Sequence, residues 1–526
     1  VTHYEILLPE GLEGLDGRKQ ELGPYQLTVY AGSEAVPAWF GEGMTYQIFP
    51  DRFRRLRVPD PKGMVGGRWV HAAWQDEPEY RPDHSGEIRN RDFFGGSLQG
   101  VEEKLDYLHS LGVRTLYFCP IFEAAENHRY GTADYRSIDP MLGTEEDFSR
   151  LCREAHRRDM RVMLDGVFNH TGFVSRYFNG DGFYPELGAH QSQDSPYYSW
   201  YNFYQWPDQY ESLWGIYSLP SMNEHDPAYR EFIFGGEDSV VRRWLRAGAD
   251  GWRLDVADEL PDDFVAGIHA AARAEKPDAV VIGEVWEDGS TKVAYGVRRK
   301  HILGRHCDGL MNYPFRGAAL DYLRGGDAAD FMETMETLRE NYPPFAGGSA
   351  GGCLGGPAAP RFRMEADQRR RGKELLKLGA ALLFAFPGSP TVYYGDEAGM
   401  EGFEDPFNRR TFPWGREDYE LLGWFTRLGH LRQESPALRR GDIRYRAAQG
   451  PLLAFTRSAE GETILAAFNT GGESAELRLE DAERIELLLG SARFQISAQG
   501  HVLTLPPRTG SLLKLSVGSD GPQEPD

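Results

Sequence analysis

The feature that most constrains the fold is a regular alternation of short apolar segments with amphipathic ones between about residues 44 and 394. TYQIF (45–49) and VRTLYFCP (113–120) are typical of buried strands, whereas VEEKLDYLHSLG (101–112) carries its leucines on one helical face. About eight such strand–helix units indicate a parallel sheet closed into a (β/α)8 TIM barrel, an α/β fold. No GxGxxG follows a strand, so a dinucleotide-binding sheet is the weaker α/β alternative.

The barrel does not account for the whole chain. The segment after the third strand is too long for an ordinary βα connection, so it predicts a small inserted domain. Near the C-terminus, short alternating runs such as LLAFTRS (452–458) predict an antiparallel β-sandwich. The predicted divisions are a short N-terminal β-rich remnant at 1–40, the barrel at 41–436 with the inserted domain at 171–226, the C-terminal β-sandwich at 437–517 and a disordered tail at 518–526.

Composition excludes several classes of partner. The net charge of −22 argues against a sequence-independent nucleic-acid binder and against docking on anionic membranes. No run of 18 apolar residues is present, so no membrane-spanning helix is predicted. The four cysteines are scattered, and no leader segment is visible; both favour a cytoplasmic protein, or a secreted one if a signal peptide has been removed. Aromatic residues reach 13%, which suits a flat, neutral, polyhydroxylated ligand.

Charged side chains stand where three successive predicted strands end. Asp165, Asp255 and Glu284 occupy these positions, and the carboxyl ends of barrel strands form the functional face. A pair of carboxyl groups is what glycoside hydrolysis needs, one ionised and one protonated. Arg253 lies on the same strand face as Asp255 and is predicted to keep it ionised, whereas apolar neighbours are predicted to raise the pKa of Glu284. A structural ion pair is the alternative for any one carboxylate, but their convergence favours function.

Several motifs occur in a fixed order along the barrel. They include YQIFPDRF (46–53), NHRYGTADY (127–135), DGVFNH (165–170), GWRLDVADE (251–259), GEVW (283–286) and FPGSPTVYYGDE (386–397). In these motifs the chain resembles the α-amylase family of glycoside hydrolases, nearest to its neopullulanase, cyclomaltodextrinase and maltogenic amylase branch. The resemblance implies retaining hydrolysis, with or without transglycosylation, of α-1,4-glucosidic bonds in maltooligosaccharides, cyclodextrins, pullulan or starch.

The resemblance also implies individual roles. Asp255 would be the nucleophile and Glu284 the general acid/base. The implied substrate-binding residues are Tyr130, His170, Arg253, Trp286, Asp405 and Arg409, of which Arg253 also orients Asp255. Aromatic residues of the inserted segment are predicted mainly to form its core, with Trp206 and Trp214 as the candidates for sugar contact.

One motif departs from the family pattern. Where the family carries approximately LGSHDTPR on its seventh strand, this chain reads LGGPAAPR (354–361), so Pro357 and Ala358 replace the substrate-binding His and the third catalytic Asp. The Gly-, Ala- and Pro-rich stretch at 347–360 also disfavours a buried strand. Three explanations stay open: a local reading-frame error or altered segment, a catalytically impaired α-glucan-binding protein, and an enzyme that uses another third group.

Metal binding and assembly are less constrained. Many relatives hold calcium near DRF and a following Gly-Gly-Asp, but here RRLRVPDPKG follows and Ser97 replaces the Asp. We therefore predict no metal site and no required cofactor, with calcium as the alternative that these residues do not support. The predicted partner is an α-glucan, and the sequence does not determine the oligomeric state.

Overall fold

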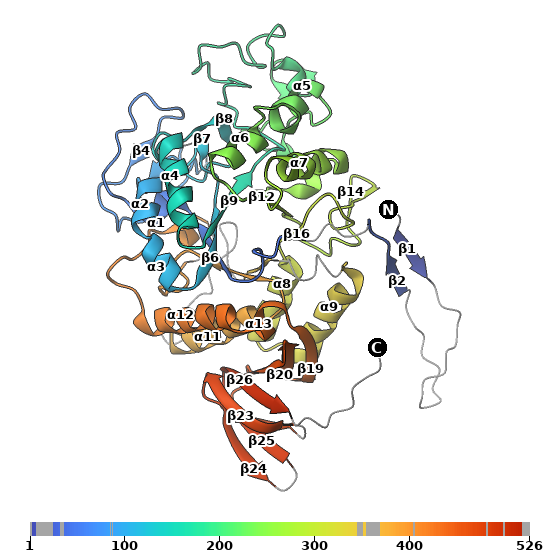
Figure 1. Cartoon of the computed structure of the whole chain (residues 1–526). Helices are drawn as coiled ribbons and strands as arrows, with labels where there is room; N and C mark the ends of the chain where they lie inside the picture. Colours follow the sequence, from blue (N-terminus) through green and yellow to red (C-terminus); the bar gives the residue numbers. More distant parts are fainter. Residues whose placement is uncertain are drawn as a thin grey trace.

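The structure is a computed structural model of the chain (Figure 1). It describes residues 3–6, 25–31, 36–84, 86, 88–343, 351–353, 369–402, 405–479, 482–497 and 500–517.

The central element is an eight-stranded parallel sheet. Its strands are β3 (Met44–Ile48), β6 (Val113–Phe118), β9 (Arg161–Gly166), β12 (Gly251–Leu254), β13 (Val280–Gly283), β16 (Gly309–Leu310), β17 (Gly351–Cys353) and β18 (Ser389–Tyr393). Their spatial order is β16-β13-β12-β9-β6-β3-β18-β17. Every strand pairs with a neighbour in chain order, and the first strand, β3, pairs with the last, β18. This cyclic order is that of a TIM barrel, so the predicted fold class is confirmed.

Helices cover the outside of this sheet (Figure 1). They are α2 (Leu98–Glu103), α3 (Leu105–Ser110), α4 (Glu145–His156), α6 (Val240–Ala247), α7 (Asp262–Glu275), α8 (Tyr313–Leu323), α9 (Ala328–Asn341), α11 (Arg369–Ala385), α12 (Tyr419–Glu434) and α13 (Pro436–Arg440). Helix α4 begins with the predicted capping box, in which Thr144 and Asp147 each accept the other's backbone N–H. The single helix predicted over 101–111 is two helices, because Lys104 leaves helical geometry between α2 and α3.

The barrel core follows from strands that are apolar on both faces. Leu116, Leu164 and Trp252 are fully buried on three adjacent strands, as expected for a sheet enclosed by helices. The charged side chains of these three strands, Arg114, Arg161, Asp165 and Arg253, all lie within two residues of a strand end. The carboxyl ends form one face of the barrel and the amino ends form the other.

Smaller sheets flank the barrel. The N-terminal hairpin pairs β1 (His3–Ile6) with β2 (Tyr25–Thr28), and the segment after β9 contains β10 (Phe203–Gln205) and β11 (Gln209–Tyr210). The C-terminal part is an antiparallel sandwich, as predicted. One sheet holds β19 (Asp442–Gln449), β20 (Leu452–Ala459), β21 (Glu462–Asn469), β26 (Thr509–Val517) and β23 (Ala482–Leu489), and the other holds β22 (Ala475–Leu479), β25 (Gly500–Leu505) and β24 (Arg493–Ser497). Buried Leu465, Leu503 and Leu513 belong to the core that joins the two sheets.

The prediction that the Gly-rich stretch at 347–360 disfavours a barrel strand is wrong in part. Strand β17 lies within it and runs parallel to β18. Because sheet pairing uses backbone groups, an adjacent strand can order residues that have little side chain of their own. Pro357, Ala358 and the tail at 518–526 lie outside the described residues.

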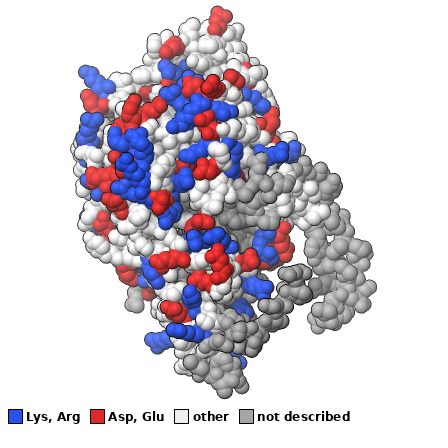
Figure 2. All heavy atoms as spheres, in the orientation of Figure 1, with Lys and Arg blue, Asp and Glu red and all other residues white. Residues whose placement is uncertain are grey.

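The surface of the folded chain carries charges of both signs. Basic and acidic side chains are interspersed over the face seen in Figure 2. Within the described part of the chain, no helix is long and apolar enough to cross a membrane.

Candidate active site

Two neighbouring barrel strands and the loops after them bring the predicted catalytic residues together. Asp165 is the penultimate residue of strand β9 and pairs in register with Arg253 of β12. Asp255 follows β12 directly, and Glu284 follows β13, whose Gly283 is in register with Leu254. Parallel register therefore places all these side chains at the carboxyl ends of adjacent strands, the face where TIM-barrel enzymes carry their active sites.

A single buried guanidinium holds the three carboxylates. Nη1 of Arg253 lies 2.7 Å from Oδ1 of Asp165 and 2.7 Å from Oδ1 of Asp255. Nη2 of the same side chain lies 2.9 Å from Oε2 of Glu284. One positive charge thus faces three buried acidic groups, Asp165, Asp255 and Glu284, which we call the acid cluster. All three carboxylates cannot be ionised together without a large electrostatic cost.

The carboxylate of Glu284 accepts three hydrogen bonds in addition to its contact with Arg253. The backbone N–H of Val256 donates to Oε2 at 2.9 Å, and Oε1 accepts from Trp286 Nε1 at 3.1 Å and from the Tyr313 hydroxyl at 3.2 Å. Burial by itself raises the pKa of Glu284, but Arg253 and these donors outweigh it, so the pKa is lowered.

The predicted division of protonation states is therefore reversed in this structure. Burial raises the pKa of Asp255 well above its usual value, because Arg253 is shared with Glu284 and Asp165 rather than reserved for Asp255. The prediction that apolar neighbours raise the pKa of Glu284 is wrong for the same reason: the residues adjacent in sequence do not include its donors Arg253 and Tyr313. The pKa of Asp165 is raised as well, chiefly by burial, so burial favours the protonated form at both aspartates.

Two tyrosine hydroxyls contact the Asp165 side of the cluster, and His170 follows the same strand, β9. The hydroxyls of Tyr117 and Tyr130 donate to Oδ2 of Asp165 at 2.8 Å and 3.1 Å. His170 is buried beyond the end of β9, and burial lowers its pKa to about 4, so its imidazole is neutral at neutral pH. Tyr117 was not predicted as a site residue, although its position at the end of strand β6 is the signal that could have indicated it.

An aromatic rim lies beside Glu284. The rings of Trp286 and Trp214 are 51% and 58% exposed, and their centroids are 5.8 Å apart. Glu259 ties the rim together, since it accepts hydrogen bonds from Trp214 Nε1 at 3.0 Å and from the Tyr295 hydroxyl. These side chains and Glu284 line a cavity of about 350 Å³. Trp206, the other aromatic candidate, donates its Nε1 to the Ala189 carbonyl within the inserted segment.

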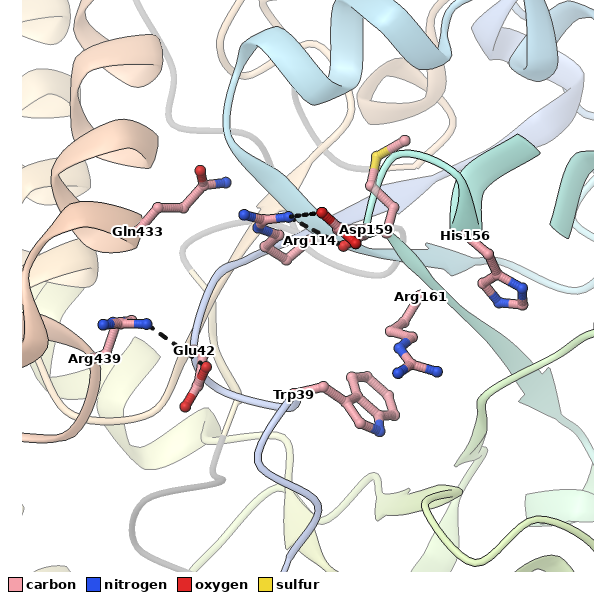
Figure 3. Close-up of a pocket in the computed structure, with 9 residues that line it drawn as sticks. Trp39, Glu42, Arg114, His156, Asp159, Arg161, Gln433 and Arg439 are labelled. Carbon is pink, nitrogen blue, oxygen red and sulfur yellow. Dashed lines mark hydrogen bonds and ion pairs between the residues drawn. The ribbon is translucent and has the colours of Figure 1, made fainter. Parts of the chain in front are cut away.

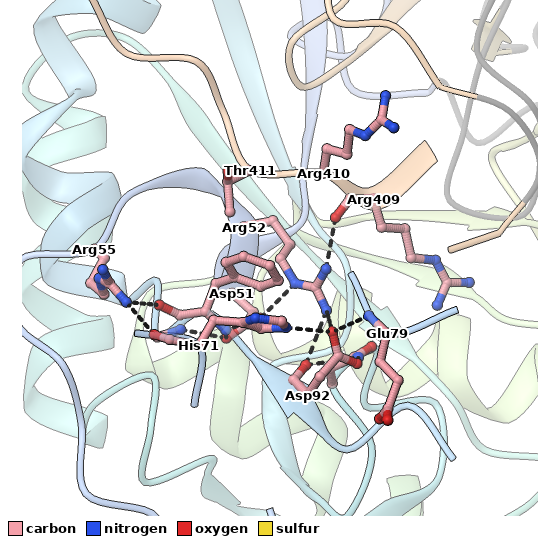
Figure 4. Close-up of polar contacts among 12 residues, drawn as sticks. Asp51, Arg52, Arg55, His71, Glu79, Asp92, Arg409, Arg410 and Thr411 are labelled. Atoms are coloured by element: carbon pink, nitrogen blue, oxygen red, sulfur yellow. Dashed lines mark hydrogen bonds and ion pairs between the residues drawn. The ribbon is translucent and has the colours of Figure 1, made fainter. Parts of the chain in front are cut away.

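Asp405 and Arg409 lie on the loop after β18 and form an ion pair, with Arg409 Nε 3.0 Å from Asp405 Oδ1. The loop is anchored from below by Arg52, whose Nη1 donates to the Arg409 carbonyl at 2.9 Å (Figure 4). Arg52 also contacts Asp51 and the carbonyl of Asp92. A buried guanidinium next to the first barrel strand therefore positions the backbone of the predicted sugar-binding pair.

The same network tests whether calcium would fit near the DRF motif. The carboxylate of Asp51 accepts the backbone N–H groups of Phe94 and Gly95 as well as Arg52 Nε. Asp92 contacts Arg52, and His71 Nε2 lies 3.1 Å from its Oδ2 (Figure 4). Because N–H donors and cationic groups occupy these oxygens, the residues present do not fit a calcium ion.

Comparisons with known proteins agree with this architecture. Residues 47–420 match the model of the α-amylase catalytic domain, and residues 447–510 match that of the maltogenic amylase C-terminal domain. A (β/α)8 barrel with paired carboxyl groups at the ends of neighbouring strands is an architecture found among glycoside hydrolases. More specifically, the chain belongs to the α-amylase family.

Individual relatives resemble nearly the whole chain. An amylopullulanase from Thermoanaerobacterium saccharolyticum is 33% identical over 95% of this chain, which spans only 44% of that relative's length. Neopullulanase 2 from Thermoactinomyces vulgaris is 32% identical, over 96% of this chain and 83% of its own. Among solved structures, the cyclic α-maltosyl-(1→6)-maltose hydrolase from Arthrobacter globiformis matches with a TM-score of 0.75 and 30% identity, over 92% of this chain and all of its own.

Proposed function

We propose that the chain is a retaining glycoside hydrolase that cleaves α-1,4-glucosidic bonds of α-glucans. The observation that carries this proposal is that Asp255 and Glu284 contact the two terminal nitrogens of the same Arg253 guanidinium. Such a shared contact supports the short separation, about 5 Å, that a retaining pair needs for direct attack by one carboxylate. The family membership supports the same chemistry.

In the proposed reaction, Glu284 donates its proton to the glycosidic oxygen while a carboxylate oxygen of Asp255 bonds to the anomeric carbon. The bond from that carbon to the leaving oxygen breaks, and the leaving sugar departs with the proton. Water then attacks the anomeric carbon while Glu284 removes a proton from that water. The bond between the anomeric carbon and Asp255 breaks in the same step. An acceptor sugar in place of water would give transglycosylation.

This cycle requires a redistribution of the proton in the acid cluster. In the structure burial keeps the pKa of Asp255 high, whereas donors keep that of Glu284 low. Oε1 of Glu284 accepts hydrogen bonds from Trp286 Nε1 and from the Tyr313 hydroxyl. A sugar whose glycosidic oxygen approaches Oε1 would have to displace these two donors. Loss of these hydrogen bonds would raise the pKa of Glu284 and prepare it as the acid.

The proposed substrates are maltooligosaccharides, cyclodextrins, pullulan or starch. Exposed Trp214 and Trp286 supply flat apolar surfaces for sugar rings on the leaving-group side of Glu284. Tyr130, His170, Asp405 and Arg409 are proposed to bind the sugars on the other side. We propose a cytoplasmic location, with secretion as the alternative, and a function that involves no metal ion, nucleic acid or membrane.

A second candidate function, a catalytically impaired α-glucan-binding protein, is favoured by one specific observation. Pro357 and Ala358 stand where the family pattern has the His and Asp of its seventh-strand motif. Removal of one group that stabilises the transition state costs about a hundredfold or more in rate. The acid cluster described above would then bind sugar without rapid turnover.

Turnover of maltotriose separates the two candidates. The chain as it stands, its Glu284→Gln variant, and a Pro357→His/Ala358→Asp double variant are incubated with maltotriose, and release of glucose or maltose is followed. A hydrolase releases product, and Glu284→Gln abolishes the release; unchanged turnover in that variant would refute the assignment. Absence of turnover in the parent, together with a gain of about a hundredfold or more over the detection limit in the double variant, would support the binding-only candidate.

A further inference from the structure

A second polar cavity lies at the opposite end of the barrel from the acid cluster. It has a volume of about 490 Å³ and is lined by Trp39, Glu42, Arg114, Asp159, Arg161 and Arg439 among others (Figure 3). Arg114 is the second residue of strand β6 and Arg161 is the first residue of β9. The opposite ends of these two strands carry Tyr117 and Asp165 of the acid cluster. We call this cavity the basal pocket.

Each arginine of the basal pocket faces a carboxylate. Arg114 Nη1 lies 3.8 Å from Asp159, Arg439 Nη1 lies 3.8 Å from Glu42, and Arg161 Nη1 lies 3.1 Å from Asp250. Figure 3 shows the first two pairs across the hollow from Trp39 and Arg161. The lining is therefore rich in charge but nearly balanced in sign, which disfavours a strongly anionic ligand.

Hydrogen-bonding capacity remains on these side chains. A guanidinium has five N–H donors, and the contacts of Arg114 and Arg439 with their carboxylates both run through Nη1. Within the described part of the chain, the buried Nε of Arg439 has no hydrogen-bond partner. The carboxylate oxygens Oε2 of Glu42 and Oδ2 of Asp159, at 3.8 Å from their arginines, are beyond hydrogen-bond distance of them, whereas Arg114 Nη1 donates to the Asp159 backbone carbonyl at 3.3 Å. The pocket thus presents both donors and acceptors.

An indole completes the pocket. Trp39 is half-buried, its Nε1 donates to the Asp278 carbonyl at 2.8 Å, and Arg161 lies over the ring at 5.8 Å. These contacts fix the orientation of the indole at the cavity wall, so the side chain does not have to reorient when a ligand binds. A fixed aromatic surface surrounded by mixed donors and acceptors matches a ligand that is apolar on its ring face and carries hydroxyls at its edge, since each hydroxyl both donates and accepts.

We propose that the basal pocket is a non-catalytic docking site for a neutral sugar segment, an α-glucan chain of one or two glucose units in the cavity. The choice of α-glucan rests on the proposed function; the choice of a neutral polyhydroxylated ligand rests on the pocket itself. The pocket lies at the amino ends of the strands, at the opposite end of the barrel from the acid cluster. A glucan bound there would therefore leave the acid cluster open to a second glucan chain. The site would matter for starch-sized substrates and not for maltotriose.

Retardation of the native protein in gels that contain amylopectin tests the proposal. The chain, Trp39→Ala, Arg439→Gln and Trp286→Ala are compared, together with Trp39→Ala/Trp286→Ala. Tyr419→Ala is the matched control, because Tyr419 is 74% exposed and lines neither cavity. We expect Trp286→Ala to retain part of the retardation, and the added Trp39→Ala to weaken the remaining binding about tenfold. Arg439→Gln, which removes the guanidinium donors and the part-buried pair with Glu42, should weaken it as well.

The outcomes separate this proposal from the catalytic one. If Trp39→Ala and Arg439→Gln both fold, as judged by thermal melts, and both migrate like the parent, the docking site is refuted. If inorganic phosphate raises the Tm of the parent but not of Arg439→Gln, the pocket is an anion site and the proposal fails. Turnover of maltotriose is measured in parallel: its absence counts against the proposed activity alone, whereas retardation that depends on Trp39 supports the docking site in either case.

Discussion

Asp250 and Asp255 lie at opposite ends of the same barrel strand, β12, and have opposite surroundings. Asp250 is buried at the amino end, where His156, Arg161 and Lys276 all contact its carboxylate. Asp255 is buried at the carboxyl end, where it shares Arg253 with two other acids. Burial raises the pKa of both, but the hydrogen bond with His156 and the charge of Lys276 reverse the effect at Asp250, whose pKa is lowered.

The difference shows how one strand separates stability from chemistry. At the amino end, excess positive charge stabilises an ionised carboxylate that also accepts the backbone N–H of Val162. At the carboxyl end, burial and two neighbouring acidic groups raise the pKa of Asp255. The first arrangement stabilises the fold, and the second keeps a reactive group in a state that the fold alone would not favour.

The largest expected effect comes from the carboxyl end. In a chain that turns over maltotriose, Asp255→Asn should lower kcat by at least about a thousandfold, because an amide cannot serve as the nucleophile. Its Tm should be equal to or higher than that of the parent, since one of three acids around Arg253 is removed. Stopped assays of glucose release and a thermal melt measure both quantities. A variant with lost activity and a much lower Tm would contradict the contrast drawn here.

The matching change at the amino end should act on stability. Asp250→Asn leaves Arg161 and Lys276 without their carboxylate partner and removes a carboxylate acceptor from His156, and we expect the free energy of unfolding to fall by about 2–4 kcal/mol. The acid cluster lies at the far end of the strand, so kcat for maltotriose below the melting range should stay within about twofold of the parent. Chemical denaturation with urea gives the first quantity. A Tm equal to that of the parent would show that these ion pairs contribute little.

The pH dependence of stability should have opposite signs in the two variants. The folded-state pKa of Asp255 is raised, so the parent loses stability as the pH rises above about 4, at up to about 1.4 kcal/mol per pH unit. The stability gained by Asp255→Asn should therefore grow from pH 4 upward. The pKa of Asp250 is lowered, so its contribution is present above about pH 4 and is lost in more acid solution. Urea titrations at several pH values test both slopes, and parallel slopes would refute the assignment.

The smallest expected effect concerns a single donor. Tyr313→Phe removes the hydroxyl that donates to Oε1 of Glu284 at 3.2 Å. The pKa of Glu284 should rise by about half a unit, because a donor to the ionised form is lost. The pH profile of kcat/KM should shift its basic limb upward by that amount, while Tyr419→Phe, on an exposed side chain, should leave the profile unchanged. A downward shift would mean that Tyr313 stabilises the protonated acid.

Much of the architecture could be predicted because it is encoded locally. Apolar runs such as that around Leu116 define buried strands, and the capping box at Thr144 and Asp147 fixes the start of a helix. Parallel strands then require the residues after β12 and β13 to be neighbours, which is why the acid cluster was foreseen. Its roles in catalysis stay predictions.

The protonation states could not be predicted in the same way. The pKa of Glu284 depends on Arg253, on the Val256 backbone and on Tyr313, which comes from the strand–helix unit that follows. No pattern within GEVW reports these donors. Likewise, the link from Glu259 to Trp214 and Tyr295 joins segments that are far apart along the chain.

The neutral imidazole of His170 has a consequence for acid tolerance. Because its pKa is lowered to about 4, this ring does not gain a charge anywhere between pH 5 and 8, the interval in which most histidines titrate. If His170 binds sugar as proposed, its contribution to substrate binding should vary little over that interval. Any loss of rate in that range would then arise from the carboxyl groups and not from weakened binding by this histidine.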